Sequence, residues 1–163
     1  MRHILTRIVL SAAVIGGTPA MGLAQDTAKP APAAASDQAI ALQKTVYHVN
    51  YKGGDDGAGY KPALNNIRNQ LDAVGTENAD IRVVLHGDGV NLLSIARGDQ
   101  TLQGLIAGLK SEGVRFLVCN NTLTGRDINA ETDLFDVWPE DIVPAGVVEI
   151  VRLQQEGFAY LRP

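Results

Sequence analysis

The side chain with the clearest chemical potential is Cys119, the only cysteine in the 163-residue chain. It ends the apolar run Val114–Val118, so we expect it at the end of a buried strand. A thiol placed there is either a nucleophile, which acts as its thiolate, or an inert side chain that fills space. A thiolate needs a cation or a helix N-terminus nearby. Arg126 is the candidate cation, and the backbone amides of residues 120–122 are candidate donors if a helix begins there.

Two histidines follow the same pattern of polar residues at strand ends. His86 closes the apolar run 81–86 and precedes Gly87-Asp88-Gly89, where missing side chains let a ligand approach the backbone. It can act as an acid or base near Cys119, or simply be hydrogen-bonded at the end of its strand. His48 lies near the end of the run 45–51 and is a second candidate, with a contact to a neighbouring subunit as its structural alternative.

Three asparagines complete the set of candidate binding residues. The amides of Asn50, Asn120 and Asn121 can orient a ligand or cap turns. Copper or zinc at His48, His86 and Cys119 is chemically possible, but no short ligand spacing supports such a site. The loop 53–59 lacks the spacing of a dinucleotide or phosphate-binding loop, and no G-x-S-x-G motif is present. We therefore expect no cofactor.

The elements that position these residues alternate between strands and helices. Strands are expected at 45–51, 81–86, 114–119 and 158–161, and helices at 62–74, 91–96, 99–112 and 127–137. Residues 145–156 are β-branched but begin after Pro144 and end at Gly157, which favours a helix. This alternation predicts a mainly parallel sheet with helices on both faces, whose functional crevice lies at the carboxyl ends of the strands. His48, Asn50, His86 and Cys119 would gather there.

The N-terminus is expected to be a signal peptide rather than part of the fold. Residues 1–24 combine two arginines, a short apolar run and a small-residue cleavage site before Gln25. The run is too short to span a bilayer, so no membrane span is expected after cleavage. Residues 25–43 are rich in alanine and proline and predict a flexible leader, with a single domain at 44–163. The formal charge of −4 argues against a nucleic acid partner.

Export changes what a lone cysteine means. In an oxidising compartment cysteines usually pair, and Cys119 has no partner within its own chain. It is therefore buried and inert, linked to another molecule, or kept as a reactive thiol. The predicted periplasmic location and the strand-end position favour a free, reactive thiol.

The segments Val46–Asn50, Val83–Val90, Gly113–Leu123 and Val143–Val147 together resemble the DsrE/DsrF-like family, as does Leu153–Tyr160. The resemblance covers residues 44–163. It implies a three-layer α/β/α sandwich with a flavodoxin- or Rossmann-like topology, and homo-oligomers that are commonly trimers or hexamers. In the sulfur-relay members a cysteine in this region carries sulfur as a persulfide, and Cys119 is the matching position.

The first hypothesis is thus a periplasmic persulfide carrier or sulfurtransferase. Cys119 would take sulfur from a donor and deliver it to an acceptor protein or small thiol, with His86 assisting proton movement and Asn120 or Asn121 orienting the outer sulfur. Two alternatives stand beside it. One is a non-catalytic oligomeric module that binds a small ligand or metal, and the other is an assembly subunit with an inert Cys119.

Overall fold

The structure is a computed structural model that describes residues 41–163. The expected signal peptide and nearly all of the expected leader lie outside the described residues. Gln43, the last residue of the expected leader, already belongs to the first strand. Among residues 41–163 no helix is both long and apolar enough to cross a membrane.

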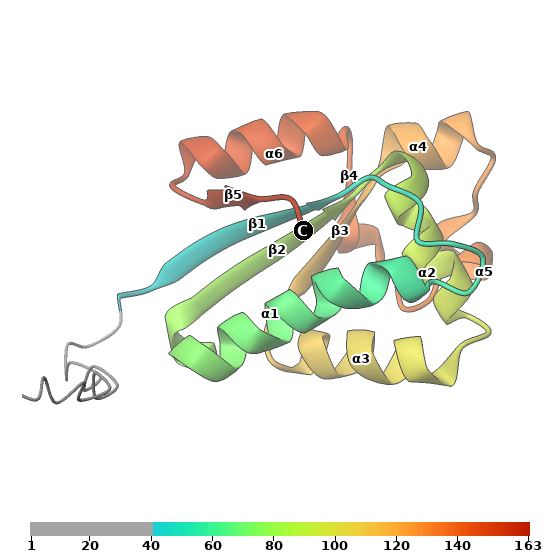
Figure 1. Ribbon diagram of the computed structural model, residues 1–163. Coiled ribbons are helices and arrows are strands. Elements are labelled where there is room, and N and C mark those ends of the chain that lie inside the picture. Colours follow the sequence, from blue (N-terminus) through green and yellow to red (C-terminus); the bar gives the residue numbers. More distant parts are fainter. Residues whose placement is uncertain (1–40) are drawn as a thin grey trace, which may run out of the picture. The chain divides into compact units, whose positions relative to one another are not determined.

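A five-stranded sheet forms the centre of the domain, and every neighbouring pair of strands is parallel. The strand order is β4-β3-β2-β1-β5 (Figure 1). The strands are β1 (Gln43–Val49), β2 (Ala79–Leu85), β3 (Arg115–Cys119), β4 (Ile142–Val143) and β5 (Ala159–Leu161). The three central strands are buried on both faces, as expected for a parallel sheet covered by helices.

Helices cover both faces, so the domain has three layers (Figure 1). The helices are α1 (Lys61–Val74), α2 (Asn91–Ala96), α3 (Gln100–Ser111), α4 (Asn120–Gly125), α5 (Ala130–Asp133) and α6 (Gly146–Gln155). One apolar core joins α1, α2 and α3 to one face, and a smaller core joins α6 to the other. The predicted α/β/α sandwich on a parallel sheet is confirmed.

Most expected elements are present, with small shifts in their ends. The helices at 61–74, 91–96 and 100–111 match the apolar spacing, and the carboxylate of Asp99 accepts the N–H groups of Thr101 and Leu102 as the expected cap. The segment after Pro144 is a helix, as favoured. Strand β1 ends at Val49 rather than residue 51, because its partner strand β2 ends at Leu85.

The expected helix at 127–137 is wrong in extent. Only Ala130–Asp133 is helical, because Asp127 and Asp136 adopt positive φ angles of 52° and 53° and break the helical path on either side. Leu134 is nonetheless buried in the core, as expected. The two-residue strand β4 was not predicted, since so short a segment shows no periodicity.

Candidate active site

Three chemically active side chains lie on the face of the sheet that α6 covers. Because side chains alternate along a strand, residues two apart share a face. The smaller core, which packs against α6, contains one residue from each central strand: Val46, Val84 and Leu117. Two positions after each of these residues in the sequence comes a polar or reactive one: His48, His86 and Cys119, respectively. The predicted gathering of His48, His86 and Cys119 at one edge is therefore what the strand pairing produces.

Gly146, the first residue of α6, lies close to the side chains of both His86 and Cys119. A Cβ atom at position 146 would lie 3.1 Å from the Cβ of His86 and 3.3 Å from both the Cβ of Cys119 and the Cδ2 of His86. Only glycine lets the start of α6 approach both side chains without displacing one of them. The edge of His86 that faces this contact is its Cβ–Cδ2 edge, so His86 does not present a ring nitrogen there.

The sulfur of Cys119 is buried, with 5% of the residue exposed, but it is surrounded by hydrogen-bond donors. Burial alone raises the pKa of Cys119. The donors near the sulfur, which are the Gly146 N–H, the hydroxyl and N–H of Thr122, and the Asn121 N–H, act in the opposite direction and prevail, so the pKa is lowered overall. The arrangement stabilises a thiolate without a cation.

Thr122 links this thiol to strand β2. Its Oγ1 accepts the N–H of Gly87 at 2.9 Å, and the same hydroxyl is one of the donors that lower the pKa of Cys119. An oxygen that accepts one hydrogen bond becomes a better donor of the next. The turn after β2 and the thiol at the end of β3 are therefore connected through one hydroxyl group.

His48 and His86 form a hydrogen-bonded pair. Their Nε2 atoms are 2.6 Å apart, and His48 Nδ1 lies 2.7 Å from the hydroxyl of Tyr160 on β5. The pKa of His48 is lowered to about 4 by burial and then by positive charge on His86 and Arg162. Burial also lowers the pKa of His86. Both rings are consequently neutral at physiological pH.

The other expected site residues are Arg126, Asn120, Asn121 and Asn50. The Arg126 guanidinium is bound to the Asp88 carboxylate at 2.9 Å, so its charge is already paired. Asn120 and Asn121 are exposed, and Asn121 serves the thiol through its backbone N–H. Asn50 follows β1, and its Oδ1 is buried without a hydrogen-bond partner among the described residues.

The two glycines after β2, Gly87 and Gly89, allow the local path of the backbone and do not leave open space for a ligand. A Cβ at position 89 would lie 1.9 Å from the carbonyl oxygen of Val49, so the end of β1 fills that space. Gly87 has a φ of 53°, which favours glycine and lets its N–H reach Thr122.

Sequence reasoning missed Gly146, the hydroxyl group of Thr122 and Tyr160. Gly146 follows Pro144 at a helix start, a position that suggests a cap but not a contact with a thiol. Thr122 and Tyr160 act through pairings between distant segments, which periodicity does not reveal. In residues 41–163 no group of three or more histidine, cysteine or acidic side chains is arranged to hold a metal ion.

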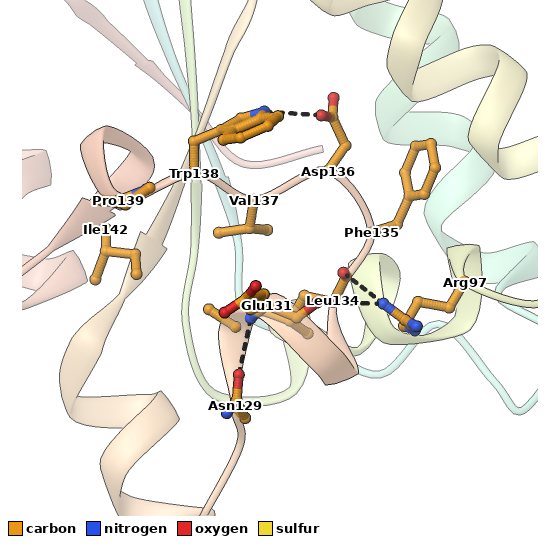
Figure 2. A pocket seen from close by; sticks show the side chains of 11 residues that line it. Arg97, Asn129, Glu131, Leu134, Phe135, Asp136, Val137, Trp138, Pro139 and Ile142 are labelled. Carbon is orange, nitrogen blue, oxygen red and sulfur yellow. Dashed lines mark hydrogen bonds between the residues drawn. The ribbon is translucent and has the colours of Figure 1, made fainter.

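A cavity of about 720 Å³ is lined mainly by residues between positions 129 and 142 (Figure 2). Ile142 contributes to its wall and packs on the α1–α3 core, whereas the next residue, Val143, packs on the α6 side with Cys119. Its apolar lining residues are Ala130, Leu134, Phe135, Val137, Trp138, Pro139 and Ile142. The 58%-exposed Trp138 is held by a 3.0 Å hydrogen bond from its Nε1 to Asp136. The cavity is separate from the cysteine site.

Comparison with known proteins identifies the same architecture. The model of the DsrE/DsrF-like family matches residues 25–163. A protein of unknown function from Methanobacterium thermoautotrophicum, MTH1491, is 33% identical, with a TM-score of 0.61 over 74% of this chain and 99% of its own. The ychN protein of E. coli shares the fold at 20% identity and a TM-score of 0.59, over 75% of this chain and 100% of its own. No functionally curated protein matches the chain in sequence.

Proposed function

Because the chain belongs to the DsrE/DsrF-like family, we propose that it is a periplasmic sulfur carrier in which Cys119 holds sulfur as a persulfide. One observation carries the proposal most directly. The only thiol of the chain is buried, yet the N–H groups of Gly146, Asn121 and Thr122 and the Thr122 hydroxyl lower its pKa. An inert space-filling cysteine would have burial alone and a raised pKa.

The loading step needs only a thiolate and a donor that contains sulfane sulfur. With thiosulfate, Cys119 S⁻ attacks the outer sulfur, a new S–S bond forms, and sulfite leaves with the electrons of the broken S–S bond. On delivery, an acceptor thiolate attacks the outer sulfur and Cys119 leaves as its thiolate. The donors that stabilise the thiolate before loading also make it a good leaving group on delivery.

The test is an intact mass after incubation of the purified protein with thiosulfate or polysulfide. A persulfide adds the mass of one sulfur atom, about 32 Da, which cyanide should then remove as thiocyanate. Cys119→Ser is the matched control and should show no adduct. If no donor gives an adduct, and Cys119 reacts with iodoacetamide only after unfolding, the proposal fails.

Export is a separate part of this proposal. It is supported by the basic, apolar and small-residue order of residues 1–24. We expect the mature protein recovered from the periplasmic fraction to begin at Gln25. A protein that keeps residues 1–24 and stays in the cytoplasmic fraction would contradict it.

A homo-oligomer, commonly a trimer or hexamer as the family resemblance implies, is also proposed. It is supported by three exposed valines on the outer surface of α6, Val147, Val148 and Val151, which are between 54% and 64% exposed. Apolar side chains grouped on an exposed helix are typical of interaction surfaces. A second copy of the chain is the proposed partner.

The cavity supports a second candidate function, the binding of a small apolar ligand. Its volume and mainly apolar walls are typical of small-molecule sites. Trp138 is the only tryptophan of the chain, so its fluorescence reports on this cavity alone. We expect saturable quenching or a blue shift with a planar probe such as anilinonaphthalene sulfonate, and loss of the response in Val137→Asp. An unchanged spectrum with that probe would contradict this candidate.

A further inference from the structure

The cavity beside Trp138 has a cationic group on an otherwise mainly apolar wall. Arg97, which directly follows α2, lines it together with the aromatic side chains of Phe135 and Trp138 (Figure 2). Within residues 41–163, no carboxylate forms an ion pair with Arg97. The wall therefore offers a positive charge that a purely apolar ligand would leave unused.

Two backbone carbonyl groups hold the guanidinium of Arg97. Its Nη1 donates to the carbonyl oxygen of Leu134 at 3.3 Å and to that of Glu131 at 3.4 Å. In the part of the chain that the structure describes, no hydrogen bond uses its Nε or Nη2. A guanidinium is a planar fork of N–H groups that matches the two oxygens of a carboxylate. Because Arg97 is already held through Nη1, it loses less freedom when it binds such a group.

The aromatic part of the wall is also held in place. The Asp136 carboxylate accepts a hydrogen bond from Nε1 of Trp138 at 3.0 Å and forms an ion pair with Lys110 at 3.0 Å. The backbone N–H of Trp138 donates to the carboxylate of the buried Asp141 at 3.3 Å. A tryptophan that is 58% exposed adds little to the core, so a ring fixed in this way is available for contact with a ligand.

Two carboxylates line the cavity as well, and they differ from Arg97 in how they are held. The charge of Asp136 is paired with Lys110. Glu131 is exposed and its carboxylate has no ion-pair or hydrogen-bond partner between residues 41 and 163. An exposed side chain that nothing holds can turn toward water, so its repulsion of an anion is screened. The fixed guanidinium should therefore determine which charge the cavity prefers.

We propose that the cavity binds an aromatic carboxylate, with the carboxylate paired to Arg97 and the ring against Trp138. This inference rests on the second candidate function, ligand binding in the cavity, and names the class of ligand. A volume of about 720 Å³ is within the range of small-molecule sites. The apolar wall supplies affinity for the body of the ligand, and Arg97 supplies selectivity for its head group.

Phenylbutyrate and phenylbutanol are matched probes, because they share an apolar body and differ in the charge of the head group. Each is titrated into the purified protein, and the change in Trp138 fluorescence gives the Kd. We expect phenylbutyrate to bind about fivefold more tightly, as for a favourable ion pair that stays partly exposed. Added sodium chloride should reduce this advantage and leave the affinity for phenylbutanol nearly unchanged.

Arg97→Gln should lower the affinity for phenylbutyrate to that for phenylbutanol. Unchanged binding of phenylbutanol shows that the cavity keeps its shape without the bonds from Arg97 to the two carbonyls. Arg162→Gln is the matched control, because this exposed arginine follows β5 at one edge of the sheet, whereas Ile142 of the cavity wall belongs to β4 at the other. It should bind both probes as wild type does. Glu131→Gln removes a repulsive charge and should tighten phenylbutyrate alone, by about twofold.

The outcomes separate this inference from ligand binding itself. Equal affinity for both probes in wild type, or equal weakening of both in Arg97→Gln, overturns the role of Arg97 and leaves a cavity that binds apolar ligands. Tighter binding of phenylbutylamine than of phenylbutyrate also overturns the inference, since Glu131 would then determine the selectivity. If neither phenylbutyrate nor phenylbutanol binds, the inference fails. The second candidate function fails with it only when anilinonaphthalene sulfonate also gives no response.

Discussion

The hydroxyl of Thr122 is one of the donors that lower the pKa of the Cys119 thiol, three residues earlier in the chain. The same oxygen accepts the N–H of Gly87 at 2.9 Å, so it is held in place by the turn after β2. The ionisation of the thiol therefore depends on a contact between two segments 35 residues apart in sequence.

The first prediction concerns this hydroxyl. Thr122→Val keeps the side-chain shape but removes a donor to the thiolate, so the pKa of Cys119 should rise. Because only the thiolate is alkylated, the rate of reaction with iodoacetamide near neutral pH should fall about tenfold. Thr122→Ser keeps the hydroxyl and should react nearly as fast as wild type. Equal rates in Thr122→Val and wild type across the pH range would contradict the role of the hydroxyl.

The second prediction concerns the start of α6. In Gly146→Ala, the added Cβ would lie 3.1 Å from His86 and 3.3 Å from Cys119, so α6 must move outward and its N–H must leave the sulfur. We expect a loss of about 1–3 kcal/mol in the free energy of unfolding and a higher pKa of Cys119. Urea denaturation and the pH profile of alkylation measure both.

Gly104→Ala is the matched control. Gly104 lies in the middle of α3, is exposed, and a Cβ there would meet nothing within 4 Å. Alanine should stabilise this helix by about 0.5–1 kcal/mol and leave the alkylation profile unchanged. If Gly146→Ala behaves like Gly104→Ala, the close approach of α6 to the site is not important for the thiol.

The third prediction concerns acid. Folding lowers the pKa of His48 from 6.5 to about 4, mainly through burial. Between these values the unfolded chain binds a proton that the folded chain does not, so the free energy of unfolding should decrease as the pH falls through this window. His86, whose pKa is also lowered, acts in the same direction.

His48→Gln should make this pH dependence shallower by up to one proton, because glutamine does not titrate. Urea midpoints across the window measure the slope. Exposed Arg162 also contributes to the low pKa of His48, so Arg162→Gln should raise that pKa and narrow the window. If the free energy of unfolding changes equally steeply with pH in His48→Gln and in wild type, the lowered pKa of His48 is not the cause of this pH dependence.

The fourth prediction concerns assembly. Replacing Val147, Val148 and Val151 by serine removes the exposed apolar surface of α6 without touching its buried residues Ile150 and Leu153. Light scattering coupled to size-exclusion chromatography should show a smaller species than wild type, with unchanged circular dichroism. A monomeric wild type, or a mutant of unchanged mass, would rule out this surface as the contact between copies.

The sequence was sufficient for the elements that have strong periodicity or clear caps. The apolar stripes of α1 and α3 and the carboxylate cap of Asp99 depend on neighbours within a few residues, so they could be predicted. The rule that parallel strands end at one edge was also enough to bring His48, His86 and Cys119 together.

The details that decide the chemistry depend on contacts between distant segments. The pairing of Arg126 with Asp88 and the approach of Gly146 to Cys119 join residues whose spacing in the sequence carries no signal. The irregular path at 127–137 arises from two aspartates with positive φ, which local helix propensity does not anticipate. For the same reason, the donors around the thiol were expected from residues 120–122, whereas α6 supplies one of them as well.

Cys119, which lies close to the start of α6, is the only thiol of the chain, and this determines the order in which donor and acceptor can react. The chain has no second cysteine, so a loaded sulfur cannot pass to another thiol of the same chain or be released by an internal disulfide. Donor and acceptor must visit the same atom in turn. Steady-state transfer should therefore follow ping-pong kinetics, with parallel double-reciprocal lines and inhibition by excess of either substrate.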